Sequence, residues 1–128
     1  MKKVRDYLVT YPGDPVALSY LADAHLALAA DFKNDGNLDS AVEHLTKAAD
    51  YVQEDTAGTK KKIDLLKKDL AETFYRNGVR IFRKDIDRAI RYWKQSVEFD
   101  PDHHKAKLRL RNALETKKTL KDVDRAVK

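Results

Sequence analysis

The fold is decided by residues 74–101, which read FYRNGVRIFRKDIDRAIRYWKQSVEFDP. Apolar and small residues recur in this stretch three or four positions apart, the spacing of one face of an α-helix: Phe74, Gly78, Ile81, Ala89, Trp93 and Val97. The charged residues Arg83–Asp85 interrupt the pattern, and Asp100–Pro101 ends it because proline does not continue a helix. The stretch therefore predicts two helices joined by a tight turn.

The same helical spacing continues on both sides of this stretch. Asp14–Pro15 is typical of a helix start, with an acidic N-cap before a proline at the first helical position. Asn34–Asn37 has the composition of a turn, and no segment has the pattern of a strand. We expect about six helices: one within 1–11, two within 15–53, two within 59–101 and one over 102–121. The first helix of 59–101 is predicted to run from about Thr59 to Arg83.

A repeated pattern of small and large residues links the two halves of the chain. A small residue on one helix is followed by an alanine and a large residue on the next: Gly78, Ala89 and Trp93 in one half, and Ala22, Ala41 and Leu45 in the other. The small residue lets the second helix approach, and the large residue fills the space that remains. With Pro101 closing the second helix, the pattern resembles the tetratricopeptide repeat (TPR), a helix–turn–helix unit of about 34 residues.

The resemblance implies an all-α fold in which antiparallel helix pairs stack as a right-handed α-solenoid. We expect one TPR-like domain over 1–128, with a partial helix at 1–11, an irregular repeat at 15–53, a repeat with an extended first helix at 59–101 and a capping helix at 102–121. The first repeat is irregular because Ala22 and Ala41 are 19 positions apart, about seven more than the family's spacing. An unrelated helical bundle is the alternative.

The two ends of the chain carry parts of further units. Segment 1–11 resembles a second helix whose first helix is missing. The chain is therefore either an excised segment of a longer array, which we expect, or a small stand-alone protein with irregular caps. The run from Ala89 to Trp93, placed ahead of Asp100–Pro101, is similar to sequences in bacterial TPR proteins of the cell envelope.

Composition limits both the chemistry and the compartment. The 128 residues are 42% hydrophobic and 37% charged, and the absence of cysteine excludes thiol catalysis, zinc fingers and iron–sulfur ligation. The longest apolar run, Leu26–Ala30, is far shorter than the roughly 20 residues that cross a bilayer. The first residues lack the pattern of a signal peptide. We expect a soluble protein, cytoplasmic, or envelope-associated if it is a fragment of a larger exported protein.

Few side chains qualify for catalysis or metal binding. His25 lies on the apolar face of its helix, where we interpret it as a packed, hydrogen-bonded core histidine. His44 has no acidic or histidine neighbour one turn on, and the rings of adjacent His103 and His104 point in different directions on a helix. No phosphate-binding loop or nucleophile elbow occurs. We therefore expect no catalytic residue, no metal site and no cofactor, and a protein that is not an enzyme.

A binding surface is the better candidate for a functional site. In the TPR family, the first helices of successive units line a concave groove that binds a partner peptide or helix. The resemblance implies these groove residues: Ser19, Asp23, Leu26, Tyr75, Val79, Phe82, Lys105, Arg109 and Asn112. Tyr75, Val79 and Phe82 form an apolar stripe beside the core stripe, and two interpretations stay open. The stripe is either an exposed strip of anchors for the partner or one side of a helix buried on two sides.

Charge is distributed unevenly along the chain. Residues 1–64 carry 8 Lys and Arg against 11 Asp and Glu, whereas residues 65–128 carry 18 against 10. The basic half supports an alternative function, the binding of nucleic acid or another polyanion. Trp93 argues against this alternative because a tryptophan at a core position is not available to stack on a base. Protein binding is therefore the preferred prediction.

Overall fold

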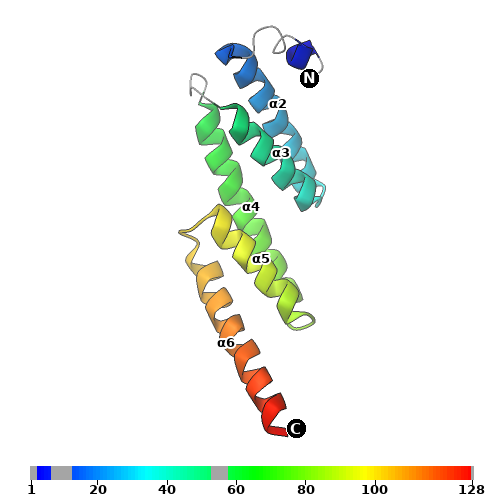
Figure 1. Cartoon of the computed structure of the whole chain (residues 1–128), viewed down its shortest axis with the longest axis vertical. Helices are drawn as coiled ribbons and strands as arrows, with labels where there is room; N and C mark the ends of the chain where they lie inside the picture. Colours follow the sequence, from blue (N-terminus) through cyan, green and yellow to red (C-terminus); the bar gives the residue numbers. More distant parts are fainter. Residues whose placement is uncertain (1–2, 7–12, 53–57, 128) are drawn as a thin grey trace. The chain divides into compact units, whose positions relative to one another are not determined.

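The computed structural model describes residues 3–6, 13–52 and 58–127, and nearly all of them are helical (Figure 1). The helices are α2 (Pro15–Asn34), α3 (Leu38–Tyr51), α4 (Thr59–Ile81), α5 (Ile86–Phe99) and α6 (His104–Val127). Residues 3–6 are also helical. No strand occurs in these ranges, so the prediction of an all-α chain is confirmed. Much of the predicted helix in 1–11, and Gln53 at the end of the first predicted repeat, lie outside the described residues.

Short polar residues cap the starts of α2, α3 and α5, and the sequence predicts the first of these caps, Asp14. Asp14 Oδ1 accepts hydrogen bonds from the backbone N–H of Val16 at 2.9 Å and of Ala17 at 3.1 Å, with Pro15 in the first turn. The side chain of Asn37 accepts from the backbone of α3, and that of Asp85 accepts from the backbone of α5. These bonds satisfy N–H groups that have no partner inside the helix.

Two predicted helix ends differ from the structure. The helix that begins at Thr59 ends at Ile81 rather than Arg83, because the backbone N–H groups of Lys84 and Asp85 both turn back to the carbonyl of Ile81. The final helix continues past residue 121 to Val127, since residues 104–127 contain no glycine or proline that would stop it. None of the described helices combines the length and the apolar character needed to cross a bilayer.

The chain forms two compact units, residues 1–66 (unit 1) and 67–128 (unit 2), and the boundary falls within α4. In unit 1, α2 and α3 pack together as an antiparallel pair joined by a short turn. Four alanines with no exposed surface lie in this pair, with two large leucines among them: Ala22, Ala29, Ala41, Ala48, Leu21 and Leu45. Small side chains let the two helices come close, as the repeat pattern predicts.

Unit 2 is built around the indole of Trp93. Its core contains Ala89, Ile90, Trp93 and Ala113, against which half-buried side chains pack: Tyr75, Ile81, Phe82, Ile86 and Leu110. Trp93 is only 1% exposed, and its Nε1–H donates a hydrogen bond to the carbonyl of Tyr75 at 3.1 Å. The prediction that Trp93 occupies the core is therefore confirmed.

Gly78 is the point of closest approach between α4 and the Trp93 ring. A Cβ atom at Gly78 would lie 2.7 Å from Trp93 Cε2 and 2.8 Å from Cδ1, well inside normal contact distance. About one helical turn after Trp93 on α5, the hydroxyl of Ser96 donates a hydrogen bond to the carbonyl of Ala71 on α4 at 2.6 Å. Ser96 is fully buried. Small residues on both helices thus allow α4 and α5 to pack closely.

Candidate functional site

The predicted groove residues of unit 1 lie on α2 and are half-buried: Ser19, Asp23 and Leu26. The carboxylate of Asp23 is engaged within the unit, because the hydroxyl of Thr59 donates to its Oδ1 at 3.0 Å. Thr59 is buried and is the first residue of α4, so this bond connects α2 to the start of α4.

The predicted apolar stripe of unit 2 lies on α4, and its three members differ in exposure. Tyr75 and Phe82 are half-buried against the Trp93 core. The Phe82 ring lies 5.6 Å from the Trp93 ring, and the Tyr75 ring lies 4.9 Å from that of His103. Val79, between them in the sequence, is 41% exposed. Two members of the stripe therefore pack inside unit 2, while the third reaches its surface.

The predicted groove residues of α6 are all exposed: Lys105, Arg109 and Asn112. Neither Lys105 nor Arg109 forms an ion pair with any residue that the structure describes. Asn112 lines an open hollow of about 410 Å³ along α6, together with Glu115, Thr116, Thr119 and Leu120. In unit 2, the groove residues of α4 and those of α6 both belong to helices that pack on the Trp93 core.

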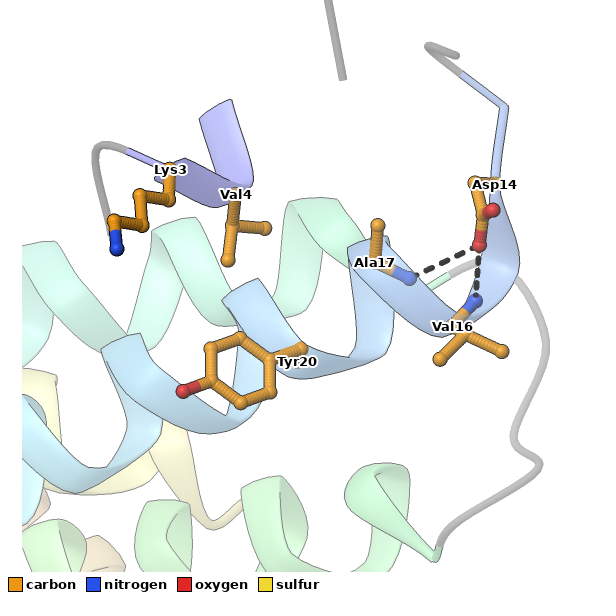
Figure 2. Close-up of a pocket in the computed structure, with 6 residues that line it drawn as sticks. All are labelled: Lys3, Val4, Asp14, Val16, Ala17 and Tyr20. Carbon is orange, nitrogen blue, oxygen red and sulfur yellow. Dashed lines mark hydrogen bonds between the residues drawn. The ribbon is translucent and has the colours of Figure 1, made fainter. Parts of the chain in front are cut away.

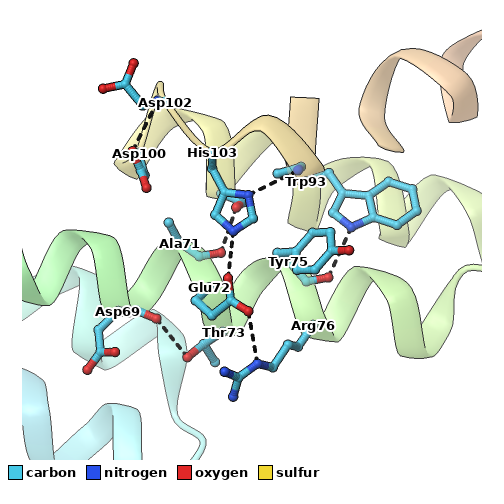
Figure 3. A network of polar contacts seen from close by, with 12 residues as sticks. Asp69, Ala71, Glu72, Thr73, Tyr75, Arg76, Trp93, Asp100, Asp102 and His103 are labelled. Atoms are coloured by element: carbon cyan, nitrogen blue, oxygen red, sulfur yellow. Dashed lines mark hydrogen bonds and ion pairs between the residues drawn. The ribbon is translucent and has the colours of Figure 1, made fainter. Parts of the chain in front are cut away.

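A polar network joins α4 to the start of α6 (Figure 3). His103 Nδ1 accepts from the backbone N–H of Ala106 at 3.1 Å, which leaves the proton on Nε2 to be donated to Glu72 Oε2 at 2.7 Å. Arg76 Nε donates to the other carboxylate oxygen of Glu72 at 3.2 Å. The hydrogen bond from His103 lowers the pKa of Glu72 below its ordinary value, and Arg76 adds to the effect.

Sequence reasoning missed this network because it considered His103 only as a metal ligand. The imidazole takes the place of an N-cap side chain for α6, and Glu72 holds the ring from the neighbouring helix. Both ring nitrogens are used in these bonds, so the histidine positions the start of α6 and has no nitrogen left for acid–base chemistry in this arrangement.

A second histidine contact lies in unit 1, between α2 and α3. The Nδ1 atoms of His25 and His44 are 2.9 Å apart, so one ring donates and the other accepts. The rings of Tyr51 and Phe32 extend the stack on either side. Burial lowers the pKa of His25, and the charges of His44, Lys47 and Arg5 lower it further. His25 is buried and hydrogen-bonded, as predicted, but its partner was not predicted.

The start of α2 borders an open apolar hollow of about 390 Å³ (Figure 2). Lys3 and Val4 lie on one side, and Asp14, Val16, Ala17 and Tyr20 lie on the other. Val16 and Tyr20 are 77% and 63% exposed, and they stand one helical turn apart. No feature of the repeat pattern pointed to these two side chains.

A smaller hollow of about 190 Å³ lies between α4 and α5 in unit 2, lined by Asn77, Arg80, Ile81, Arg88 and Tyr92. Within residues 3–6, 13–52 and 58–127, no group of three His, Asp or Glu side chains could hold a metal ion. Comparison of the chain with models of protein families, with curated proteins and with solved structures gave no match.

Proposed function

We propose that this chain is a non-enzymatic, TPR-like scaffold that binds a peptide or helix of another protein in a groove lined by α4 and α6. The proposal is carried by the exposure of Val79 at 41%, on a helix whose neighbouring aromatic side chains are packed into the unit. Tyr75 and Phe82 fix the position of α4, so Val79 is presented on a rigid surface. A rigid apolar contact costs little entropy when a partner binds.

The packing of the helix pairs supports the TPR-like character of the proposal. In each half of the chain, small residues occupy the helix crossing and a large residue fills the neighbouring space, which is the arrangement that the repeat pattern requires. Helix pairs of this kind bury only part of their apolar surface alone and stack with neighbours to bury more. A stack of helix pairs has extended surfaces suited to binding other proteins.

The charges beside the groove define the partner's chemistry. Lys105 and Arg109 are exposed cations without a carboxylate partner in the described part of the chain. A partner with acidic side chains next to an apolar residue would match them, with the apolar residue placed against Val79. The apolar contact would supply most of the affinity, and the charges would supply orientation and association rate.

Selection of peptides from a random display library against the whole chain tests the proposal. Peptides that bind in the groove are expected to lose affinity more than about fivefold on Val79→Asp, since an anchoring contact contributes over about 1 kcal/mol. They are also expected to lose affinity on the double change of Lys105 and Arg109 to Glu.

The matched control is Val123→Asp, which changes the same residue type at a position that is 55% exposed on α6 but outside the groove. Circular dichroism establishes that both aspartate variants are folded. If the selected peptides bind Val79→Asp and Val123→Asp equally well, the groove is not their site and the proposal is wrong.

Polyanion binding is a second candidate, supported by the surplus of 18 Lys and Arg over 10 Asp and Glu in residues 65–128. Trp93 is buried, so the affinity would come from phosphate contacts alone. Titration with random-sequence DNA at increasing salt tests this candidate. Absence of binding at about 50 mM salt rules it out, because phosphate contacts are strongest at low salt.

A further inference from the structure

The hollow between α4 and α5 has walls that are fixed by the core beneath it. Asn77, Arg80 and Ile81 line it from α4, and Arg88 and Tyr92 line it from α5. The two helices are held together by the close contact of Gly78 with Trp93 and by the hydrogen bond from Trp93 to Tyr75. The helix backbones that carry the lining residues are therefore held in place without a ligand. None of them belongs to the proposed groove.

The charge of the hollow is uncompensated. No carboxylate lines it, and neither Arg80 nor Arg88 forms an ion pair with a residue that the structure describes. Other cations of the unit have partners: Arg76 contacts Glu72, and Lys117 contacts Asp87 at 2.6 Å.

The two carboxylates closest in sequence to Arg88 accept hydrogen bonds from groups other than its guanidinium. Asp85 caps α5 by accepting from the backbone N–H of Arg88 at 3.0 Å, and Asp87 pairs with Lys117 on α6. Two guanidinium groups thus line one small hollow with no anion between them. Like charges at a shared site repel each other, and an anion bound there would remove that repulsion.

The donors at the hollow are suited to a phosphate group. The guanidinium of Arg88 lies over the ring of Tyr92, with its central carbon 5.7 Å from the ring centre, which restricts its orientation. Each guanidinium presents a planar fork of N–H donors that matches two oxygens of an oxyanion. The half-buried amide of Asn77 and the phenol of Tyr92 add further donors beside them.

We infer that this hollow binds the dianionic phosphate group of a phosphate monoester. The two unpaired guanidinium groups supply two positive charges. A phosphate monoester carries close to two negative charges at neutral pH and neutralises both, whereas a carboxylate or a phosphodiester carries one and neutralises only half. Arginine clusters are a recurring means of phosphate recognition in proteins.

Side-chain NMR of the whole chain tests this inference, with phenyl phosphate added at constant ionic strength. The arginine Nε–H signals of Arg80 and Arg88 are expected to shift in a saturable manner. Phenylacetate and dimethyl phosphate, each with a single negative charge, are expected to bind at least tenfold more weakly. Affinity for phenyl phosphate should also fall below about pH 6, where the phosphate gains its second proton.

Variants identify the residues responsible. Arg80→Gln and Arg88→Gln are each expected to weaken phenyl phosphate binding at least tenfold, and Arg80→Lys, which keeps the charge but loses the fork, is expected to give a smaller loss. Arg91→Gln is the matched control, because Arg91 is also exposed on α5 but does not line the hollow. Fluorescence of Trp93 verifies that each variant keeps the folded core.

Two probes distinguish the sources of the phosphate. Tighter binding of a phosphoserine peptide than of inorganic phosphate assigns the hollow to a phosphorylated protein segment, and equal binding assigns it to a small phosphate compound. Shifts that do not saturate, or an equal loss with Arg91→Gln, would overturn the inference. A third result would also overturn the inference: affinity for thymidine oligonucleotides that increases with their length and falls equally in Arg80→Gln, Arg88→Gln and Arg91→Gln. The surface would then bind polyanions diffusely.

Discussion

Replacement of Gly78 by alanine tests the packing of α4 on α5. The added methyl group would lie 2.7 Å from Cε2 and 2.8 Å from Cδ1 of Trp93, whereas non-bonded carbon atoms normally stay about 3.5 to 4.0 Å apart. The indole has little room to move away, because it is 1% exposed and its Nε1–H is bonded to the carbonyl of Tyr75. Accommodation of the methyl group therefore requires the ring or the helix to shift.

Three contributions set the size of the effect. Alanine in place of glycine stabilises a helix interior by about 1 kcal/mol. Overpacking of a closely packed core costs about 1 to 3 kcal/mol, and displacement of the indole from its hydrogen bond costs about 1 kcal/mol more. The balance is a loss of about 1 to 3 kcal/mol in the free energy of unfolding. Urea denaturation measures it, followed by the fluorescence of Trp93, the chain's single tryptophan.

The control is the same substitution in a Trp93→Val background. All three atoms closest to the added methyl group belong to the five-membered ring of the indole, and valine has no atoms beyond Cγ to take their place. Gly78→Ala should there be neutral or stabilising by up to about 1 kcal/mol, measured by circular dichroism. The resulting double-mutant cycle isolates the contact between the two positions. A stabilising effect of Gly78→Ala in the wild-type background would refute the close packing described here.

Three further substitutions follow from other contacts. Asp14→Ala removes the N-cap of α2 and is expected to lower the free energy of unfolding by about 1 kcal/mol. Asp14→Asn keeps a capping side chain and should lose much less. Equal losses for the two variants in thermal or urea denaturation would contradict the capping role. Ser96→Ala removes the buried bond to the carbonyl of Ala71 and is expected to cost about 1 kcal/mol, whereas exposed Thr119→Ala should stabilise slightly, by about 0.5 kcal/mol, through helix propensity. Folded unit 1 keeps His25 neutral at pH values where the unfolded chain, with a histidine pKa near 6.5, takes up a proton. The free energy of unfolding should therefore be highest above about pH 6.5 and should decrease as the pH is lowered below that value. Urea denaturation at several pH values measures this decrease. If His25→Leu shows a decrease of the same size, another group is responsible.

The sequence predicts most of the helices because its signals are local. An acid followed by proline identifies the start of α2 at Asp14, and the resulting cap is observed. The spacing of Gly78 and Trp93 predicts a close helix crossing, and both residues take part in it. Such patterns depend on contacts within a helix or between consecutive helices, whose arrangement is limited by the short turn between them.

The remaining features depend on contacts that no local pattern specifies. His25 and His44 are 19 residues apart in sequence, and only the packing of α2 on α3 brings their rings together. His103 could be predicted as a cap for α6, but its bond to Glu72 requires that α4 and the start of α6 be adjacent. The hollow lined by Arg80 and Arg88 likewise exists only once α4 and α5 are packed.

The stripe of Tyr75, Val79 and Phe82 shows why the candidate groove was harder to predict than the fold. Helical spacing places the three side chains on one face, but it does not say which of them a neighbouring helix covers. The Trp93 core covers Tyr75 and Phe82 in part, while Val79 is left 41% exposed. The peptide-binding experiments with Val79→Asp and Val123→Asp test whether a partner binds at this surface.

The contact between Gly78 and Trp93 also constrains how this sequence can change over evolutionary time. A mutation that adds a side chain at position 78 is tolerated only if a smaller group has already replaced the indole at position 93. In the reverse direction, position 78 must return to glycine before tryptophan can return at position 93. An intermediate that has both the added side chain and the indole is destabilised by their overlap. Among related chains, positions 78 and 93 are therefore expected to vary together, with the size of one inversely related to the size of the other.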